Sequence, residues 1–180
     1  MKSGEGGKHP MIKLIVGLLY PESDPGLKDW SRALLEEDFG EIERESPAFS
    51  FDFTDYYRAI APKLLRRFFS FKALCIPDLI GWKKKALSME AVSSKNRKSG
   101  RRVNVDPGYL DGARLVLAST KDNAHRIYLG EGIFAEVTLC RRKNAWVGFP
   151  YTFPDFRSGV YDAFLDDVRI DWLRDMRNAG

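Results

Sequence analysis

Apolar residues along this chain occur in continuous runs, in strict alternation and with helical spacing. The run at residues 11–20 (MIKLIVGLLY) predicts a strand in the middle of a sheet, covered on both faces. A helix is predicted next, with an N-terminal cap at Asp24-Pro25 and a C-terminal cap at Gly40. The apolar residues that recur at helical spacing in this segment are Leu27, Trp30, Leu34 and Leu35.

Two further strands and a second helix are predicted in the next part of the chain. Phenylalanines alternate with polar residues at 49–53, which predicts a strand with one aromatic face, and residues 64–71 (LLRRFFSF) predict another strand. Pro77 precedes a predicted helix whose inward side chains are Leu79, Trp82, Ala86 and Met89. Three consecutive lysines, residues 83–85, are expected on or beside the outer face of this helix.

Residues 101–142 hold most of the chemically reactive side chains and begin with an alternating strand. The alternation places two valines on one face and Asn104 and Asp106 on the other. Asp106-Pro107-Gly108 predicts a type II turn that ends the strand, because proline sets φ at the second turn position and glycine accepts a positive φ at the third. Residues 114–120 (RLVLAST) then predict a short buried strand.

A hairpin is predicted in the second half of this block. Two alternating runs, residues 125–129 and 133–140, are joined by Gly130-Glu131-Gly132, a short connection that contains glycine. The expected cross-strand pairs are Leu129 with Ile133, Tyr128 with Phe134, and Arg126 with Glu136. The expected core face carries Ile127, Leu129, Ile133, Ala135, Val137 and Leu139.

The end of the chain combines an aromatic segment with a final helix. Residues 144–154 are rich in aromatic side chains and proline, and they suit a lid over a site or a partner surface. Ser158 is predicted to cap the last helix. Its apolar stripe is formed by Tyr161, Phe164, Leu165, Val168, Trp172 and Met176.

Together these elements predict an α+β fold with a mixed or mainly antiparallel sheet. The first six elements match a ferredoxin-like β-α-β-β-α-β order, extended by the hairpin and the C-terminal helix, with helices mainly on one face. Residues 1–10 are expected to be a flexible leader and residues 11–180 to form a single domain. Residues 93–100 (SSKNRKSG) have no apolar anchor and are expected to be the most mobile segment.

Composition narrows the functional classes only slightly. The chain has 180 residues, a net charge of +4 and a pI of about 9.0, without the large basic excess typical of nucleic-acid-binding proteins. Cys75 and Cys140 form no Cys-x-x-Cys pair and no secretory leader is present, so we expect a cytoplasmic protein. No apolar run is long enough to cross a bilayer, so no membrane partner is expected, and nothing in the sequence indicates an oligomeric state.

Several segments resemble a known family. They are VNVDPGYL, LVLASTKD, HRIYLGEGIFAEVTL and FPYTFPDFRS, preceded by KLIVGLLY and FSFDFTDYY. In this order, over residues 12–172, they resemble the bacterial and archaeal domain-of-unknown-function family numbered 4416, including its Asp-Pro-Gly motif at 106–108. The resemblance implies no established activity, although members are sometimes labelled GTP-binding proteins. The chain contains no G-x-x-x-x-G-K-[ST] loop to hold phosphates, so its residues give that label no support.

We interpret residues 101–142 as a site for a small anionic or phosphorylated ligand, a nucleotide being one candidate. The predicted ligand-binding residues are Asn104, Lys121, Asp122, Arg126 and Glu136. The cations would hold the anion, and the carboxylates would orient them or accept from hydroxyl groups. His125 would add an imidazole, and His125 and Asp106 are the candidate catalytic residues. No motif assigns a reaction, so the sequence leaves open whether the protein is an enzyme.

Three other chemistries compete with this interpretation. Asp106, Asp122, His125 and Glu136 are types that suit Mg²⁺ or Mn²⁺, but they have no metal-ligand spacing, so no metal site is assigned. His125 with Ser119, Thr120 or Cys140 would suit nucleophilic catalysis, but none lies in a recognised nucleophile elbow. The alternative of a different class is a non-catalytic RNA- or protein-binding module that uses the basic tract 83–102 and the aromatic segment 144–154. The sequence specifies no cofactor.

Overall fold

The structure of the protein, a computed structural model, describes residues 10–53, 57–94 and 100–179. Its elements follow the chain as β1 (Ile12–Pro21), α1 (Gly26–Phe39), β2 (Ile42–Glu45), β3 (Phe49–Phe51), β4 (Leu64–Cys75), α2 (Leu79–Ser93), β5 (Asn104–Leu110), β6 (Arg114–Ser119), β7 (Ile127–Gly130), β8 (Ile133–Arg142), β9 (Ala145–Gly148), α3 (Pro154–Arg157) and α4 (Asp162–Asn178). Within the described residues this is an α+β fold of nine strands and four helices, and the strand pairs are antiparallel. Except at their ends, the expected leader and the segment expected to be most mobile lie outside the described residues.

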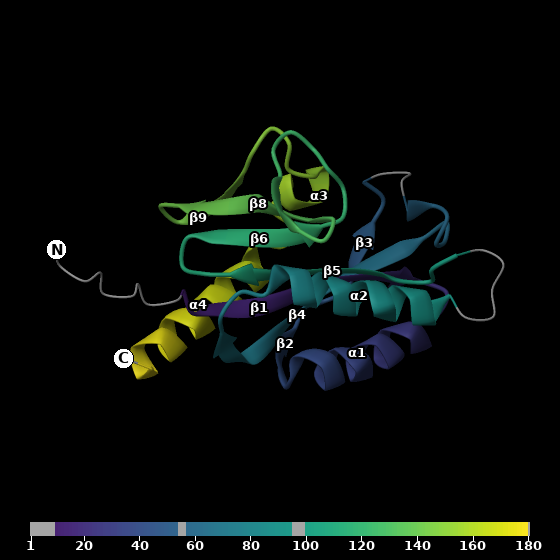
Figure 1. The fold of residues 1–180 in the computed structure, drawn as a ribbon, viewed down its shortest axis with the longest axis horizontal. Coiled ribbons are helices and arrows are strands. Elements are labelled where there is room, and N and C mark those ends of the chain that lie inside the picture. Colours follow the sequence, from purple (N-terminus) through teal and green to yellow (C-terminus); the bar gives the residue numbers. More distant parts are fainter. Residues whose placement is uncertain (1–9, 54–56, 95–99, 180) are drawn as a thin grey trace.

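β1 is an interior strand of the sheet, as its apolar run predicts (Figure 1). It is buried along its whole length and pairs with β4 on one side and β5 on the other. The full strand order is β2-β4-β1-β5-β6-β8-β7, with β3 beside β4 and β9 beside β8. Leu14, Val16 and Leu18 of β1 pack on the face covered by α1 and α2, whereas Ile15 packs on the opposite face with α4. The alternation of side chains along one strand therefore builds two cores.

Helices cover both faces of the sheet, which corrects the prediction that they lie mainly on one. The predicted apolar stripe of α4 is real, but it packs against Ile15 and Phe68, on the face opposite α1 and α2. A stripe specifies which side of a helix is apolar and not which face of the sheet it covers. The predicted cap is also wrong, because Ser158 ends α3, and Gly159 with a φ of 78° separates it from α4.

The Asp106-Pro107-Gly108 segment is not a turn, contrary to the prediction. It lies inside β5 and pairs with residues 15–17 of β1, and Gly108 does not adopt the positive φ of a type II turn. Close packing requires the glycine, because a Cβ on Gly108 would lie 2.1 Å from the Val116 carbonyl oxygen of β6. The chain reverses later, in the turn at Asp111–Arg114.

The β7–β8 hairpin forms with the predicted connection and, at its centre, the predicted register. Tyr128 pairs with Phe134, and positive φ angles at residues 130–132 reverse the chain. The predicted pair of Leu129 with Ile133 is wrong, because Leu129 is an extra residue that interrupts the pairing and Gly130 pairs with Ile133. The predicted core face is wrong for β7, since Ile127 is 67% exposed and Leu129 is 39% exposed. β7 is the last strand of the sheet, so one of its sides has no neighbouring strand among the described residues.

Candidate functional site

β5 and β6 are not paired along the first part of β5, and this gap between them is called the opening. There Lys83 and Glu90 of α2 form hydrogen bonds with the backbone of β5. The strands pair only from Gly108 onward, so no described strand pairs with Val105 on that side. The Val105 carbonyl accepts from Lys83 Nζ at 2.9 Å, and its N–H donates to Glu90 Oε1 at 2.8 Å. Every second residue of a strand directs its backbone groups to the same side, so those of Pro107 point to the opening as those of Val105 do. Proline has no N–H, so Pro107 cannot donate a hydrogen bond to β6 there.

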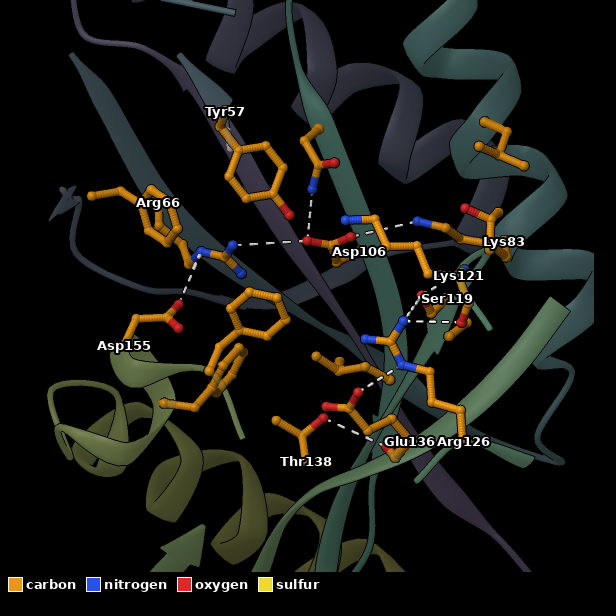
Figure 2. A pocket seen from close by; sticks show the side chains of 18 of the residues that line it. Tyr57, Arg66, Lys83, Asp106, Ser119, Lys121, Arg126, Glu136, Thr138 and Asp155 are labelled. Atoms are coloured by element: carbon orange, nitrogen blue, oxygen red, sulfur yellow. Dashed lines mark hydrogen bonds and ion pairs between the residues drawn. The ribbon is translucent and has the colours of Figure 1, made fainter. Parts of the chain in front are cut away.

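A cavity of about 110 Å³ lies at this opening (Figure 2). Strands β5, β6 and β8 supply much of its wall, and side chains from β4, α2 and α3 complete it. Its cationic lining residues are Arg66, Lys83, Arg101, Lys121 and Arg126. Three carboxylates, those of Asp106, Glu136 and Asp155, lie among them. The lining is thus rich in charge, although apolar and aromatic side chains also contribute to it.

Arg66 of β4 differs from the other cations of the cavity. It is 3% exposed, and no described residue accepts a hydrogen bond from its guanidinium. The nearest carboxylate oxygens are 3.8 Å from Nη2, on Asp106, and 3.7 Å from Nε, on Asp155, beyond hydrogen-bond distance. Its Cζ atom lies 4.9, 5.7 and 5.7 Å from the ring centres of Phe51, Phe68 and Phe156. Figure 2 shows the guanidinium pointing across the cavity toward Asp106.

The electrostatic surroundings keep Arg66 charged. Burial opposes the charged form, but the carboxylates of Asp155 and Asp106 outweigh it and raise the pKa of Arg66. Gly17 of β1 leaves room for this side chain, since a Cβ there would lie 3.3 Å from Arg66 Nη1. A buried cation without a hydrogen-bonded partner is costly for the fold, which indicates a group retained for a function.

Asp155 of α3 supports the buried end of Arg66. It is 1% exposed, and its Oδ2 accepts a hydrogen bond from the Tyr161 hydroxyl at 3.0 Å. Burial raises the pKa of Tyr161, so the hydroxyl keeps the proton that it donates. Asp155 Oδ1 has no hydrogen-bond partner among the described residues. Asp155 is therefore fixed by Tyr161 and acts on Arg66 through its charge.

Asp106 of β5 lies between Arg66 and Lys83 (Figure 2). Asn104 Nδ2 donates to its Oδ2 at 2.6 Å, and Lys83 Nζ donates to its Oδ1 at 3.4 Å. Its side chain is 21% exposed, against 5% for Glu136, so it is the more accessible carboxylate of the two. Asp106 thus holds a lysine and an amide in place and still presents part of its surface to the cavity.

The wall formed by β6 and β8 contains the predicted pair of Arg126 and Glu136. Arg126 Nε donates to Glu136 Oε2 at 2.8 Å, and its Nη1 donates to Ser119 Oγ at 2.7 Å and to the Lys121 carbonyl at 3.0 Å. Ser119 Oγ also accepts from the Lys121 backbone N–H at 3.1 Å. A hydroxyl has two acceptor positions and one donor, so Ser119 has its own proton left to donate toward the cavity.

The structure gathers five of the predicted site residues around this cavity and leaves two outside it. Those in the lining are Asn104, Asp106, Lys121, Arg126 and Glu136. His125 lies behind Glu136, with Nε2 3.0 Å from Glu136 Oε2 and its ring stacked on Tyr151 at 4.1 Å. Asp122 is exposed and is not part of the lining. His125 and Asp106, the candidate catalytic residues, therefore do not face one another across the cavity.

Sequence reasoning missed Arg66, Lys83 and Asp155. Lys83 was predicted on or beside the outer face of its helix, but it is 5% exposed. The signal was present, because Lys83 and Glu90 follow Leu79 by four and eleven positions, on the same helical face. Arg66 could have been noticed as a charge inside an apolar strand. Asp155 follows no periodic pattern, so the sequence contained no comparable signal for it.

Comparison with known proteins agrees with the resemblance of the sequence segments. The family model described as a domain of unknown function (DUF4416) matches residues 10–172. The chain belongs to this family. The match includes every described residue that lines the cavity, so the cavity is part of the DUF4416 region. No curated protein and no solved structure was found to match the chain.

The described part of the DUF4416 chain contains neither a cluster of metal ligands nor a membrane-spanning helix. Within those residues, no group of three or more His, Cys, Asp or Glu side chains is placed to hold a metal ion. The residues considered for Mg²⁺ or Mn²⁺, which were Asp106, Asp122, His125 and Glu136, therefore do not form such a group. None of the described helices combines the length and apolar character needed to traverse a bilayer.

Proposed function

We propose that this protein binds a small phosphorylated anion in the cavity between β5, β6 and β8. The observation that carries the proposal is the buried guanidinium of Arg66, which lines the cavity without a hydrogen-bond acceptor among the described residues. Buried charged groups are normally paired and hydrogen-bonded. A phosphate that enters the cavity would supply the missing acceptors, in the geometry that a guanidinium recognises.

The balance of charge in the lining supports an anionic ligand. Among the described lining residues, five cationic side chains face three carboxylates, so these residues together have two positive charges in excess. Glu90 accepts from Arg101 at 2.6 Å just behind the lining and reduces the excess to one. A phosphate monoester carries a charge of about −1.5 to −2 at pH 7, which suits such a site.

The size of the cavity favours a small metabolite over a whole nucleotide. Its volume of about 110 Å³ is well below the roughly 300–1,000 Å³ of pockets that enclose drug-sized ligands. A phosphate with a short carbon substituent suits this space, whereas a nucleotide would project out of it. The nucleotide considered from the sequence is therefore the less favoured occupant. The free state of Cys75 and Cys140 supports a cytoplasmic location for this activity.

The alternative of an RNA- or protein-binding module has less support in the basic tract. Lys83 is buried at the β5 opening, Lys84 pairs with Glu131, and Arg102 pairs with Asp24. Cations that are buried or paired in this way attract a nucleic-acid backbone less than solvated cations do.

For the fold, we infer a ferredoxin-like arrangement of β1, α1, β2, β4, α2 and β5, to which β3 is added. The strand order β2-β4-β1-β5 supports this inference.

Thermal unfolding in inorganic phosphate, against chloride at matched ionic strength, tests the proposed function. Binding to the folded state stabilises it by about 2.7 kcal/mol when phosphate exceeds its Kd a hundredfold, so the Tm of the wild type should rise. Arg66→Met removes the charge at similar volume and should abolish the rise. Arg66→Lys keeps the charge but loses the planar donor fork, so it should reduce the rise.

Arg67→Lys is the matched control for these variants. Arg67 is the next residue of β4, its Nη1 donates to Glu45 at 2.9 Å, and it is not part of the cavity lining. The Tm of this variant should rise in phosphate as much as the Tm of the wild type, and circular dichroism should show that all variants are folded. Equal rises in the wild type, Arg66→Met and Arg66→Lys would overturn the proposal.

A further inference from the structure

Two apolar side chains at the mouth of the cavity are exposed. Leu87 of α2 is 37% exposed and Phe153, just before α3, is 38% exposed, and both line the cavity. Leu87 follows Lys83 by four residues, so the two side chains are neighbours on one side of α2. That side of the helix therefore presents a buried cation within the cavity and an exposed apolar group at its opening.

The lining is buried and charged around Arg66, and it includes apolar side chains where it is exposed. Arg66, Glu136 and Asp155 are 3%, 4% and 1% exposed, so the charged groups around the buried guanidinium form the floor. The exposed residues of the lining form its mouth: they are the apolar Leu87 and Phe153, each more than a third exposed, and the polar Thr120 and Lys121. An occupant that is anionic at its inner end and apolar at its outer end would satisfy both parts.

We propose that the cavity selects a phosphate monoester with a short apolar substituent, the phosphate against Arg66 and the substituent against Leu87 and Phe153. This inference rests on the proposed function and adds the orientation and the chemical class of the ligand. The reverse orientation would place an apolar group among buried charges, which leaves those charges without acceptors. Ser119 lines the same cavity and has a proton to donate to a phosphate oxygen.

A series of alkyl phosphates tests the apolar part of this site. Isothermal titration would measure the Kd of inorganic, methyl, ethyl and propyl phosphate for the wild type. Each methylene group that is buried should lower the Kd about fourfold, until the chain passes the mouth of the cavity. Leu87→Ala and Phe153→Ala should flatten this dependence on chain length.

Two exposed valines outside the cavity provide matched controls. Val92 is on the same helix as Leu87 and is 40% exposed, and Val147 of β9 is 38% exposed; neither lines the cavity. Val92→Ala and Val147→Ala should keep the full dependence of Kd on chain length. If these controls flattened the dependence as much as Leu87→Ala and Phe153→Ala, the assignment of the apolar contact would be wrong.

The outcomes separate this inference from the function on which it rests. If inorganic phosphate binds through Arg66 but the Kd does not change from methyl to propyl phosphate, the proposed function stands and the apolar contact is refuted. If none of the phosphates binds, both proposals fail. A fall in Kd with chain length that disappears in Leu87→Ala and Phe153→Ala supports both.

A phospholipid headgroup would offer the same chemistry as a soluble monoester. Sedimentation with phosphatidylcholine vesicles, with and without phosphatidic acid, distinguishes the two sources. Binding of propyl phosphate without sedimentation supports a soluble ligand. Sedimentation that requires phosphatidic acid, and that Arg66→Met and Leu87→Ala abolish, identifies a lipid as the source of the monoester. Sedimentation that neither variant affects, together with no binding of propyl phosphate, would refute the inference.

Discussion

Removal of the Glu90 carboxylate should destabilise the opening between β5 and β6. Glu90 is 4% exposed and accepts from the Val105 N–H at 2.8 Å and from Arg101 Nη1 at 2.6 Å. In Glu90→Ala the Val105 N–H remains buried without an acceptor, which costs about 1–3 kcal/mol. The Arg101 side chain is 34% exposed, so water replaces much of its lost bond, and we add about 0–1 kcal/mol for it.

We therefore expect a loss of about 2–4 kcal/mol in the free energy of unfolding of Glu90→Ala, including the lost packing of the side chain. Glu90→Gln keeps a carbonyl oxygen for Val105 and should lose only about 1–2 kcal/mol. Urea unfolding followed by circular dichroism measures both values. Amide exchange adds a local test, because the Val105 N–H should exchange faster in Glu90→Ala than in the wild type.

Glu37→Ala, at an exposed position of α1, is the control for these measurements and should stay within about 0.5 kcal/mol of the wild type. A loss below about 1 kcal/mol in Glu90→Ala would refute the reasoning, because it would mean that the buried N–H does not depend on this acceptor. Unchanged exchange at Val105 would lead to the same conclusion.

Three further predictions concern a strand contact, an ion pair and a ligand contact. Gly108→Ala should lower the urea midpoint, since its Cβ would lie 2.1 Å from the Val116 carbonyl oxygen; an unchanged midpoint would contradict this packing. The hydrogen bond from Arg174 lowers the pKa of Asp175 in the folded state. The ionised carboxylate of Asp175 therefore stabilises the fold above its unfolded-state pKa of about 3.9, and this stabilisation is lost as the pH falls through the folded-state pKa. Asp175→Asn should therefore make the free energy of unfolding, measured in urea at acidic pH, less dependent on pH. Ser119→Ala should raise the Kd of phosphate by roughly 10- to 150-fold in calorimetry, because a hydrogen bond to a charged group contributes about 1.5–3 kcal/mol.

The elements that were predicted best from the sequence are those in which buried residues recur periodically or follow one another without a break. β1, α2 and the stripe of α4 follow directly from apolar spacing, because burial on defined faces produces that spacing. β2 (IERE) was not predicted, since its charged residues are only partly buried and show no apolar alternation. The Asp106-Pro107-Gly108 motif was assigned to a turn because proline and glycine are common in turns. In β5, Pro107 lies where the strand pairing is interrupted, and Gly108 allows the backbone of β6 to approach closely.

The candidate site was predictable only where it is local in sequence. Arg126 and Glu136 come together because the hairpin register pairs them, and register follows from alternation. Arg66 and Asp155 reach the same cavity from β4 and α3, and no periodic pattern states which distant elements will meet. His125 was expected in the site because it is the one histidine outside the expected leader and follows Lys121 in a short connection, but it stacks on Tyr151 behind Glu136. Tertiary packing therefore decides which side chains share a cavity.

The most direct test of the anion site is a crystal structure of the protein grown with methyl phosphate. We expect a phosphate in the cavity, with its oxygens at hydrogen-bond distance from the terminal nitrogens of Arg66 and from the Ser119 hydroxyl. The same crystals grown from Arg66→Met protein should contain no phosphate there. A cavity that contains only water at Arg66, with methyl phosphate bound elsewhere or not at all, would contradict the account.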